Sequence, residues 1–245
     1  MFFDILLQGT HTYVAIPVAE GKCDIESNRP SYVRYPELSG EALRLYIKAY
    51  GEETYRHYIE EFYKSPSELV DHNAPFRQLP VHDAESIIWI IIDFLLKAIP
   101  TGGNPEVTQV ASSALKVLAN HTLEPSADSR RCFMRFSREW LHNLHPKLTH
   151  LAPMLCKFSS LLNFNWTLLC IKGLLPQDIL HEAVKRILLE EIVRIRAEQC
   201  DVSLGEEIRR PLVPAPKTIN ASPSTASKRK STSAVASTSK RVRHD

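Results

Sequence analysis

The stretch His82–Ile99, with the sequence HDAESIIWIIIDFLLKAI, decides the fold class of this chain. Its apolar residues are continuous rather than arranged in a stripe, which is the pattern of a helix surrounded by protein. A strand could share this isoleucine-rich composition, but about 16 residues is long for a strand. A membrane span needs about 20 apolar residues, and here Asp93 lies near the middle of a shorter run. We therefore predict a buried helix at the centre of a domain.

Helical periodicity continues on both sides of this central helix. Ser39 is suited to cap a first helix that ends at Gly51, and a second helix is predicted from about Glu52 to Lys64. Downstream, the same periodicity predicts helices at about 106–119, 128–144, 147–163 and 176–198. No stretch has a clear strand pattern, so the predicted fold class is mainly α.

The last of these helices has the clearest pattern, with an apolar stripe on one side and charged residues on the other. We expect the stripe to be buried and the charged face to be solvated. The stripe comprises Ile179, Ala183, Ile187, Leu188, Ile192 and Ile195, and the charged face comprises Glu182, Lys185, Arg186, Glu190 and Arg194.

The composition indicates one domain followed by a tail. Of the 245 residues, 44% are hydrophobic and 24% are charged, and hydrophobic residues become sparse beyond Glu198, which places the domain at 1–200. Residues 201–245 are rich in Pro, Ser, Thr, Ala, Lys and Arg and lack apolar periodicity. Such a segment cannot bury enough surface to offset the entropy of ordering, so we expect it to be disordered. The net charge of +2 is small and does not indicate a nucleic-acid-binding domain.

The cysteines and the N-terminus both favour a soluble intracellular protein. The N-terminal segment Met1–Leu7 is apolar, but it lacks a basic flank and is interrupted by Asp4, so it does not resemble a signal peptide. No membrane contact is expected. The cysteines are odd in number and have no metal-binding or redox spacing, which favours reduced thiols. They are Cys23, Cys132, Cys156, Cys170 and Cys200.

Two basic clusters in the tail form the clearest functional pattern. A nine-residue spacer rich in Ser, Thr and Ala separates them, as in a bipartite nuclear localisation signal. Two clusters on one flexible strand can occupy two acidic pockets of an import receptor at once, which raises affinity. The alternative is a solvated tail with non-specific nucleic-acid contacts at most. We expect a nuclear protein, with the cytoplasm as the alternative. The clusters are Lys228, Arg229 and Lys230, and Lys240, Arg241 and Arg243.

Several stretches resemble the fungal-type protein kinases, a group within the protein-kinase-like fold. The sequence GTHTYVA is similar to the Gly-Thr-x-x-Tyr/Phe-x-Ala stretch that follows the activation loop and forms the platform for peptide substrates. Residues 176–189 are similar to a C-terminal helix of these proteins, and residues 38–64 to a helical insertion found in some of them. The platform-like positions are Gly9, Thr10, Tyr13 and Ala15.

The central helix is the more specific part of the resemblance. In kinases the buried helix of the C-terminal lobe opens with an aspartate whose carboxylate holds the catalytic loop from behind. The resemblance places Asp83 at that position and implies structural roles for Ser86 and Trp89 in the same helix. It thus implies a kinase-like C-terminal lobe over residues 9–198.

The chain departs from an active kinase in its motifs. It has no Gly-x-Gly-x-x-Gly loop, no Val-Ala-Ile-Lys-like strand, no His-Arg-Asp loop and no Asp-Phe-Gly. ATP and magnesium are therefore expected as cofactors only if an N-terminal half is missing from this sequence. Pro17 also stands where a kinase has a glutamate that pairs with a distal arginine.

The polar residues near the central helix have structural interpretations. Helical neighbours point to different faces, so His82, Asp83 and Ser86 are not expected to form a catalytic triad. We expect Asp83 to accept a hydrogen bond at the start of the helix. Asp93 would be costly if charged and unpaired, so we expect it to face an arginine or a backbone donor.

Clusters of histidines and of tyrosines are candidates for a metal site and a binding groove, respectively. His142, His145 and His150 lack a Glu or Cys at helical spacing, so no metal site is expected. The five tyrosines between residues 46 and 63 could line a binding groove, but packing between two amphipathic helices explains them more simply. They are Tyr46, Tyr50, Tyr55, Tyr58 and Tyr63.

Three functions remain open. The first is a non-catalytic, truncated fungal-type kinase lobe that binds an unidentified protein and enters the nucleus through an import receptor. The second is the C-terminal part of an active Ser/Thr kinase whose ATP-binding half is missing here. The third is an unrelated, all-helical nuclear scaffold. For this chain as it stands, the missing motifs favour a protein without catalytic activity.

Overall fold

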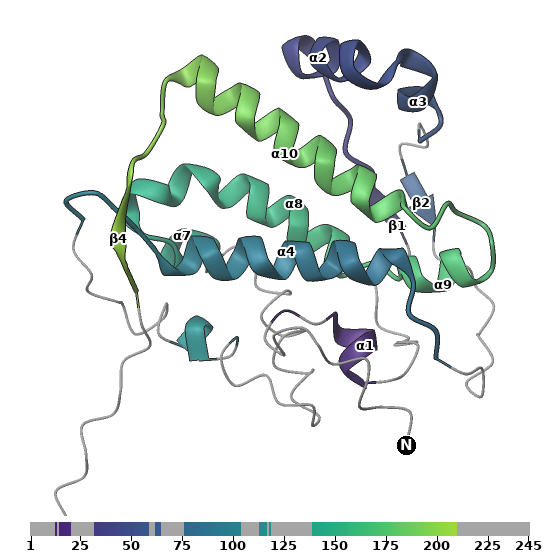
Figure 1. Ribbon diagram of the computed structural model, residues 1–245, viewed down its shortest axis with the longest axis horizontal. Helices are drawn as coiled ribbons and strands as arrows, with labels where there is room; N and C mark the ends of the chain where they lie inside the picture. The colour runs from purple at the N-terminus through teal and green to yellow at the C-terminus, as the bar shows by residue number, and fades with distance from the viewer. Residues whose placement is uncertain are drawn as a thin grey trace, which may run out of the picture. The chain divides into compact units, whose positions relative to one another are not determined.

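Helices dominate the part of the chain that the computed structural model describes, namely residues 13, 15–20, 32–58, 62–64, 76–103, 113–116, 118 and 139–209. All of these residues belong to one unit, residues 1–212. The mainly α fold class is confirmed (Figure 1). Gly9 and Thr10, both basic clusters of the tail, and Cys23 and Cys132 lie outside the described residues.

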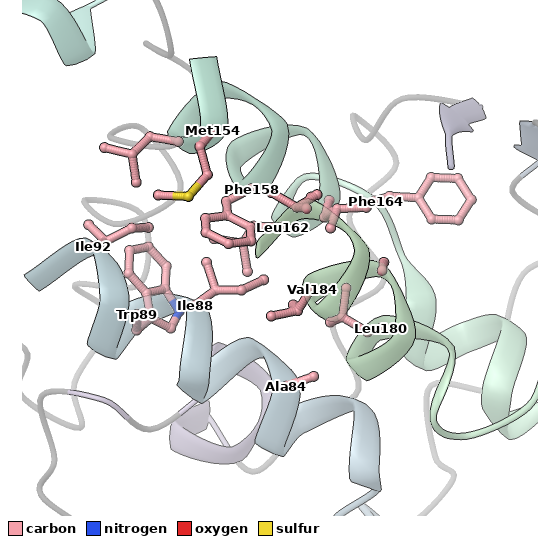
Figure 2. Packing of buried hydrophobic residues seen from close by; sticks show 14 of the residues in the cluster. Ala84, Ile88, Trp89, Ile92, Met154, Phe158, Leu162, Phe164, Leu180 and Val184 are labelled. Atoms are coloured by element: carbon pink, nitrogen blue, oxygen red, sulfur yellow. The ribbon is translucent and has the colours of Figure 1, made fainter. Parts of the chain in front are cut away.

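Helix α4, Pro80–Lys97, lies against three helices that come later in the sequence. These are α8, Ala152–Leu162; α9, Trp166–Ile171; and α10, Ile179–Glu198. Figure 2 shows Ile88, Trp89 and Ile92 of α4 meeting Phe158 of α8 and Val184 of α10. Each such side chain contributes about 1.5–3 kcal/mol when fully buried, so this contact forms the centre of the core.

The prediction that α4 is buried on every side is wrong. Ile87, Ile90 and Phe94 are 40%, 48% and 55% exposed, respectively. They recur at spacings of three and four, so they lie along one side of the helix. We call these three residues the α4 ridge. A continuous apolar sequence therefore does not show which side of a helix is exposed to solvent.

Four short strands form two antiparallel pairs, although no clear strand was predicted. Strand β1, Tyr32–Arg34, pairs with β2, Phe62–Lys64. Strand β3, Ala98–Pro100, follows α4 directly and pairs with β4, Leu204–Ile208. Because β3 and β4 follow α4 and α10, their pairing brings the C-terminal ends of both helices together, and the two helices run in the same direction (Figure 1).

The predicted insertion is helical only in its first part. Helix α2, Gly40–Tyr50, begins after Ser39 and ends at Gly51, as predicted. Helix α3, Glu52–Arg56, ends well before the predicted limit at Lys64, because residues 62–64 form strand β2. A further short helix, α1, spans Ile16–Glu20.

Most of the two helices predicted at about 106–119 and 128–144 lies outside the described residues. Residues 113–116 are helical, and α7 spans Trp140–Asn143. The helix predicted at 147–163 is a 3-10 helix, η3, at Pro146–Leu151, followed by α8. Pro153 lies in the first turn of α8, where a proline is tolerated, but it could not donate a hydrogen bond within a longer helix.

The domain boundary predicted at residue 200 is too early. Arg209 is buried, and its Nη1 donates to the carbonyls of Leu96 at 3.3 Å and Asn143 at 2.9 Å. Its backbone N–H donates to the carbonyl of Lys97 at 2.8 Å. These donors satisfy carbonyls at the end of α4, which no helical residue can reach. The polar composition after residue 200 therefore gave no indication of strand β4 or of the residue that caps α4.

Candidate functional site

The start of α4 is organised by a buried histidine. His82 Nδ1 accepts a hydrogen bond from the backbone N–H of Leu79 at 3.1 Å, and its Nε2 lies 3.2 Å from Thr167 Oγ1. The ring also stacks on Phe76, with centroids 5.6 Å apart. Burial lowers the pKa of His82 to about 4, so the ring is neutral near pH 7. With both nitrogens engaged inside the protein, this histidine organises the helix start.

Asp83 does not have the role predicted for it. Its side chain is exposed, and Gln78 Nε2 donates to its Oδ1 at 3.4 Å. Because the helix begins at Pro80, the third helical residue, which is placed to reach the backbone N–H before the helix, is His82. The prediction of a helix-start acceptor was right, but it named the wrong residue.

The platform-like stretch lies against α4. The backbone N–H of Ala15 donates to Ser86 Oγ at 3.1 Å, and that of Ile16 donates to Glu85 Oε1 at 2.9 Å. Trp89 Nε1 donates to the same oxygen of Glu85 at 3.3 Å. Three residues singled out from the sequence, Ala15, Ser86 and Trp89, are therefore brought together around residues 85–89 of α4.

Among the described residues, Asp93 pairs with a lysine and a tyrosine rather than with an arginine or a backbone donor. Lys97 Nζ lies 2.7 Å from its Oδ2, and the hydroxyl of Tyr13 donates to the same oxygen at 2.9 Å. Burial and then this hydrogen bond raise the pKa of Tyr13, because both disfavour the phenolate. The buried carboxylate thus joins the platform-like stretch to the second half of α4.

A buried arginine lies at the contact of α2 and α3 with α10, where the sequence predicted a solvated face. Arg186 and Glu182 are both buried, and Arg186 Nε lies 2.8 Å from Glu182 Oε1. Its Nη2 donates to the carbonyl of Tyr55 at 2.9 Å. Its Nη1 donates to the carbonyls of Pro36 at 3.3 Å and Tyr58 at 3.4 Å.

Four tyrosines surround this guanidinium. The ring centroids lie between 4.3 and 6.0 Å from the Arg186 guanidinium carbon, close enough for cation–π attraction. Three of them were predicted to pack between helices, and the structure assigns them to this cluster. The four residues are Tyr35, Tyr46, Tyr55 and Tyr58.

The cluster is held by charge-assisted hydrogen bonds. The hydroxyl of Tyr46 donates to Glu182 Oε1 at 2.6 Å, and that of Tyr58 donates to Asp178 Oδ2 at 2.9 Å. Burial and then the Asp178 hydrogen bond raise the pKa of Tyr58 to about 12. Burial alone would raise the pKa of Glu182, but hydrogen bonds from Lys185, Tyr46 and Arg186 hold it below its ordinary value. The cluster is satisfied internally, which identifies it as structural.

The histidines that were considered as metal ligands do not lie together. His142 is exposed on α7, whereas His145 is buried and its Nδ1 accepts from the backbone N–H of Lys147 at 3.2 Å. Among the described residues, no group of three or more His, Cys, Asp or Glu is placed to hold a metal ion. Cys156, Cys170 and Cys200 are free thiols. None of the described helices is long and apolar enough to cross a membrane.

Two of the hollows lined by described residues have volumes of several hundred Å³. The larger, about 660 Å³, lies between the extended segment 32–39 and helices α8 and α10. Ion pairs Arg34–Glu37 and Lys157–Glu190 lie in its lining, so it has no net charge. The second, about 380 Å³, lies between α4 and α10 and is lined mainly by apolar side chains.

Comparison with protein-family models, curated proteins and solved structures finds no match to this chain. The fold and its side chains therefore define only a broad class of protein. It is a mainly helical domain with a packed interior and with apolar side chains exposed along one face of a helix.

Proposed function

We propose that this chain is a protein-interaction module built as a kinase-like C-terminal lobe. The observation that carries the proposal is the α4 ridge, three large apolar side chains exposed on the central helix. Single exposed apolar residues are common, but a row of them along one helix is typical of a surface that meets another protein. The ridge requires no catalytic residue, in keeping with the missing kinase motifs.

The contacts at the start of α4 support the kinase-like part of the proposal. The resemblance relates two stretches about 70 residues apart, and these stretches hydrogen-bond to each other through Ala15, Ile16, Glu85 and Ser86. The exposed position of Asp83 differs from the kinase pattern, in which this carboxylate holds a catalytic loop.

The same contacts keep a second function open, that of the substrate-binding part of an active Ser/Thr kinase. In that case the N–H groups of Ala15 and Ile16 would fix the peptide platform to α4. Mixing the purified chain with ATP, magnesium and a generic Ser/Thr substrate protein tests this directly. We expect no phosphate transfer, and robust transfer would replace the binding function with a catalytic one.

Proximity labelling in living cells tests the binding function. We expect a biotin-ligase fusion of the full chain to label a reproducible set of proteins, and Phe94→Asp to remove members of that set. Leu141→Asp is the matched control, because Leu141 is equally exposed at 55% but lies on α7. It should leave the set unchanged. Identical sets for all three proteins would contradict the role of the α4 ridge.

A further inference from the structure

The second hollow has the shape and lining of a helix-binding groove. Hereafter it is called the α4–α10 groove, and it is formed by Ile87 of α4, by Leu188, Leu189 and Ile192 of α10, and by Tyr50 at the end of α2. Ile192, predicted to be buried, is 45% exposed, and Tyr50 is 52% exposed. The walls are two neighbouring helices that run in the same direction, the surface on which a third helix packs.

The charge of the groove is confined to one end. Of the described residues in its lining, only His181 and Lys185 have basic side chains and none has a carboxylate, and both basic residues lie in the first two turns of α10. Lys185 Nζ lies 2.5 Å from Glu182 Oε2 and 4.1 Å from the ring centroid of Tyr50. Glu182 also pairs with Arg186, and Asp178 at the start of α10 accepts from Tyr58, so these two carboxylates and two cations have no net charge; of the four residues, Lys185 alone lines the groove.

The Lys185 ammonium is accessible, because its side chain is about one-third exposed, whereas Arg186 and the paired carboxylate of Glu182 are buried. Helices α4 and α10 both begin at this end, so the positive ends of their dipoles add to the potential there. A ligand that fits the groove is therefore apolar along its length and acidic at one end.

We propose that the α4–α10 groove binds an amphipathic helix of a partner protein whose acidic residues lie over Lys185. The inference rests on the proposed binding function and specifies the chemistry of the partner. From His181 to Ile192 the groove follows about 16 Å of α10, at ~1.5 Å per residue, or about three turns of the partner helix. Apolar residues at positions i, i+3 or i+4, and i+7 would enter it.

A second copy of this chain fits the groove less well. The exposed stripe of α10 begins with Lys185 and ends with Arg196, which is also exposed. Antiparallel pairing of α10 with its own copy would bring these like charges together. A partner helix with an acidic end avoids this repulsion.

Two labelled peptides test the groove by fluorescence anisotropy with the full chain. Both are 16-residue alanine-based helices with leucines at helical spacing; one has two glutamates at its C-terminal end, and the other has two lysines there. We expect the acidic peptide to bind at least tenfold more tightly at low salt. The difference should shrink at high salt, because exposed charges are screened.

Single substitutions test whether the peptide binds in the groove. Ile192→Asp should weaken binding of the acidic peptide at least tenfold, whereas Leu141→Asp on α7, outside the groove lining, should leave it unchanged. Lys185→Gln should abolish the preference between the peptides, and Lys185→Glu should reverse it. The conservative Gln variant keeps this test valid if the added carboxylate beside Glu182 disturbs the fold.

Absence of peptide binding, equal binding of both peptides, or insensitivity to Ile192→Asp would overturn the groove proposal. Concentration-dependent self-association that competes with the peptide would also overturn it, in favour of a second copy. These results are separable from the proposed function. If labelled partners depend on Phe94 but the chain does not bind the peptide, only the groove proposal is refuted. Peptide binding without such partners refutes only the role of the α4 ridge.

Discussion

At the scale of single residues, His82 should make the stability of the domain depend on pH. A histidine in the unfolded chain has a pKa of about 6.5, and burial lowers that of His82 to about 4 in the folded chain. Between these values the unfolded state binds more protons, so stability is complete above pH 6.5 and is lost as the pH falls towards 4. The loss amounts to about 3 kcal/mol, at ~1.4 kcal/mol per pH unit.

Urea unfolding at pH 7.5 and 4.5 measures this effect. Wild type should lose about 2–3 kcal/mol more than His82→Asn on acidification. The asparagine carbonyl can still accept from the N–H of Leu79, but it does not titrate. Equal pH dependence in the two proteins would show that the histidine does not titrate with folding.

Asp83→Ala is the matched control at the neighbouring position. Asp83 is exposed, and among the described residues its side chain accepts only the long hydrogen bond from Gln78, so its loss should cost about 0.5 kcal/mol or less. A cost of 1 kcal/mol or more at pH 7.5 would restore the capping role first predicted from the sequence.

The exchange of roles between His82 and Asp83 shows what local sequence can reveal about a helix start. The need for an acceptor was predictable, because the first N–H groups of any helix lack partners. The identity of the acceptor depends on the first helical residue, and a shift of one position changes it. Pro80 was the available signal, since proline is favoured at the first position of a helix.

At the scale of elements, α10 shows why a charged face need not be a solvated one. Its periodicity correctly predicted a helix over most of 176–198. It could not reveal that α2 and α3 cover Glu182 and Arg186, because the partners of Arg186 lie 128 to 150 residues away. The tyrosine-rich composition of α2 and α3 was the only local signal, since aromatic faces attract a buried guanidinium.

Arg186→Met should therefore loosen α2 and α3 rather than the core. It removes one of the three donors to the buried Glu182 carboxylate and the guanidinium donor of three backbone carbonyls, and breaking a buried ion pair costs about 3–5 kcal/mol. Helix α2 otherwise contacts the domain through a small cluster of Leu38, Ala42 and Tyr46. Hydrogen exchange should accelerate most at residues 40–56, with smaller changes in α4 and α8.

Arg44→Met is the control for Arg186→Met. Arg44 is exposed and pairs with Glu41 on the surface of α2, so its loss should leave the free energy of unfolding nearly unchanged. Uniform acceleration across the domain in Arg186→Met would contradict a local role, because it would place α2 and α3 in the same cooperative unit as the core.

At the scale of the whole molecule, the sequence predicted the helical class but not how the segments meet. The central helix, the α2–Gly51 boundary and the last helix follow from local periodicity and turn residues. The four strands are three to five residues long, too short for alternation to be visible. The exposed α4 ridge was hidden because an all-apolar run has no polar positions to mark its solvent side. The relation to kinases stays a prediction.

Localisation is the property of the whole chain that the tail should control. Deleting Lys240–Arg243 leaves one basic cluster, and loss of two-site binding should lower affinity for an import receptor by about 10²–10⁴-fold. A fluorescently tagged protein should then move from nucleus to cytoplasm. Ser233→Ala with Ser237→Ala keeps both clusters and the net charge of the tail, and should remain nuclear. Unchanged nuclear accumulation after the deletion would leave the basic clusters as a solvated surface only. Because the deletion lies far along the chain from α4 and α10, it should also leave binding of the acidic peptide unchanged.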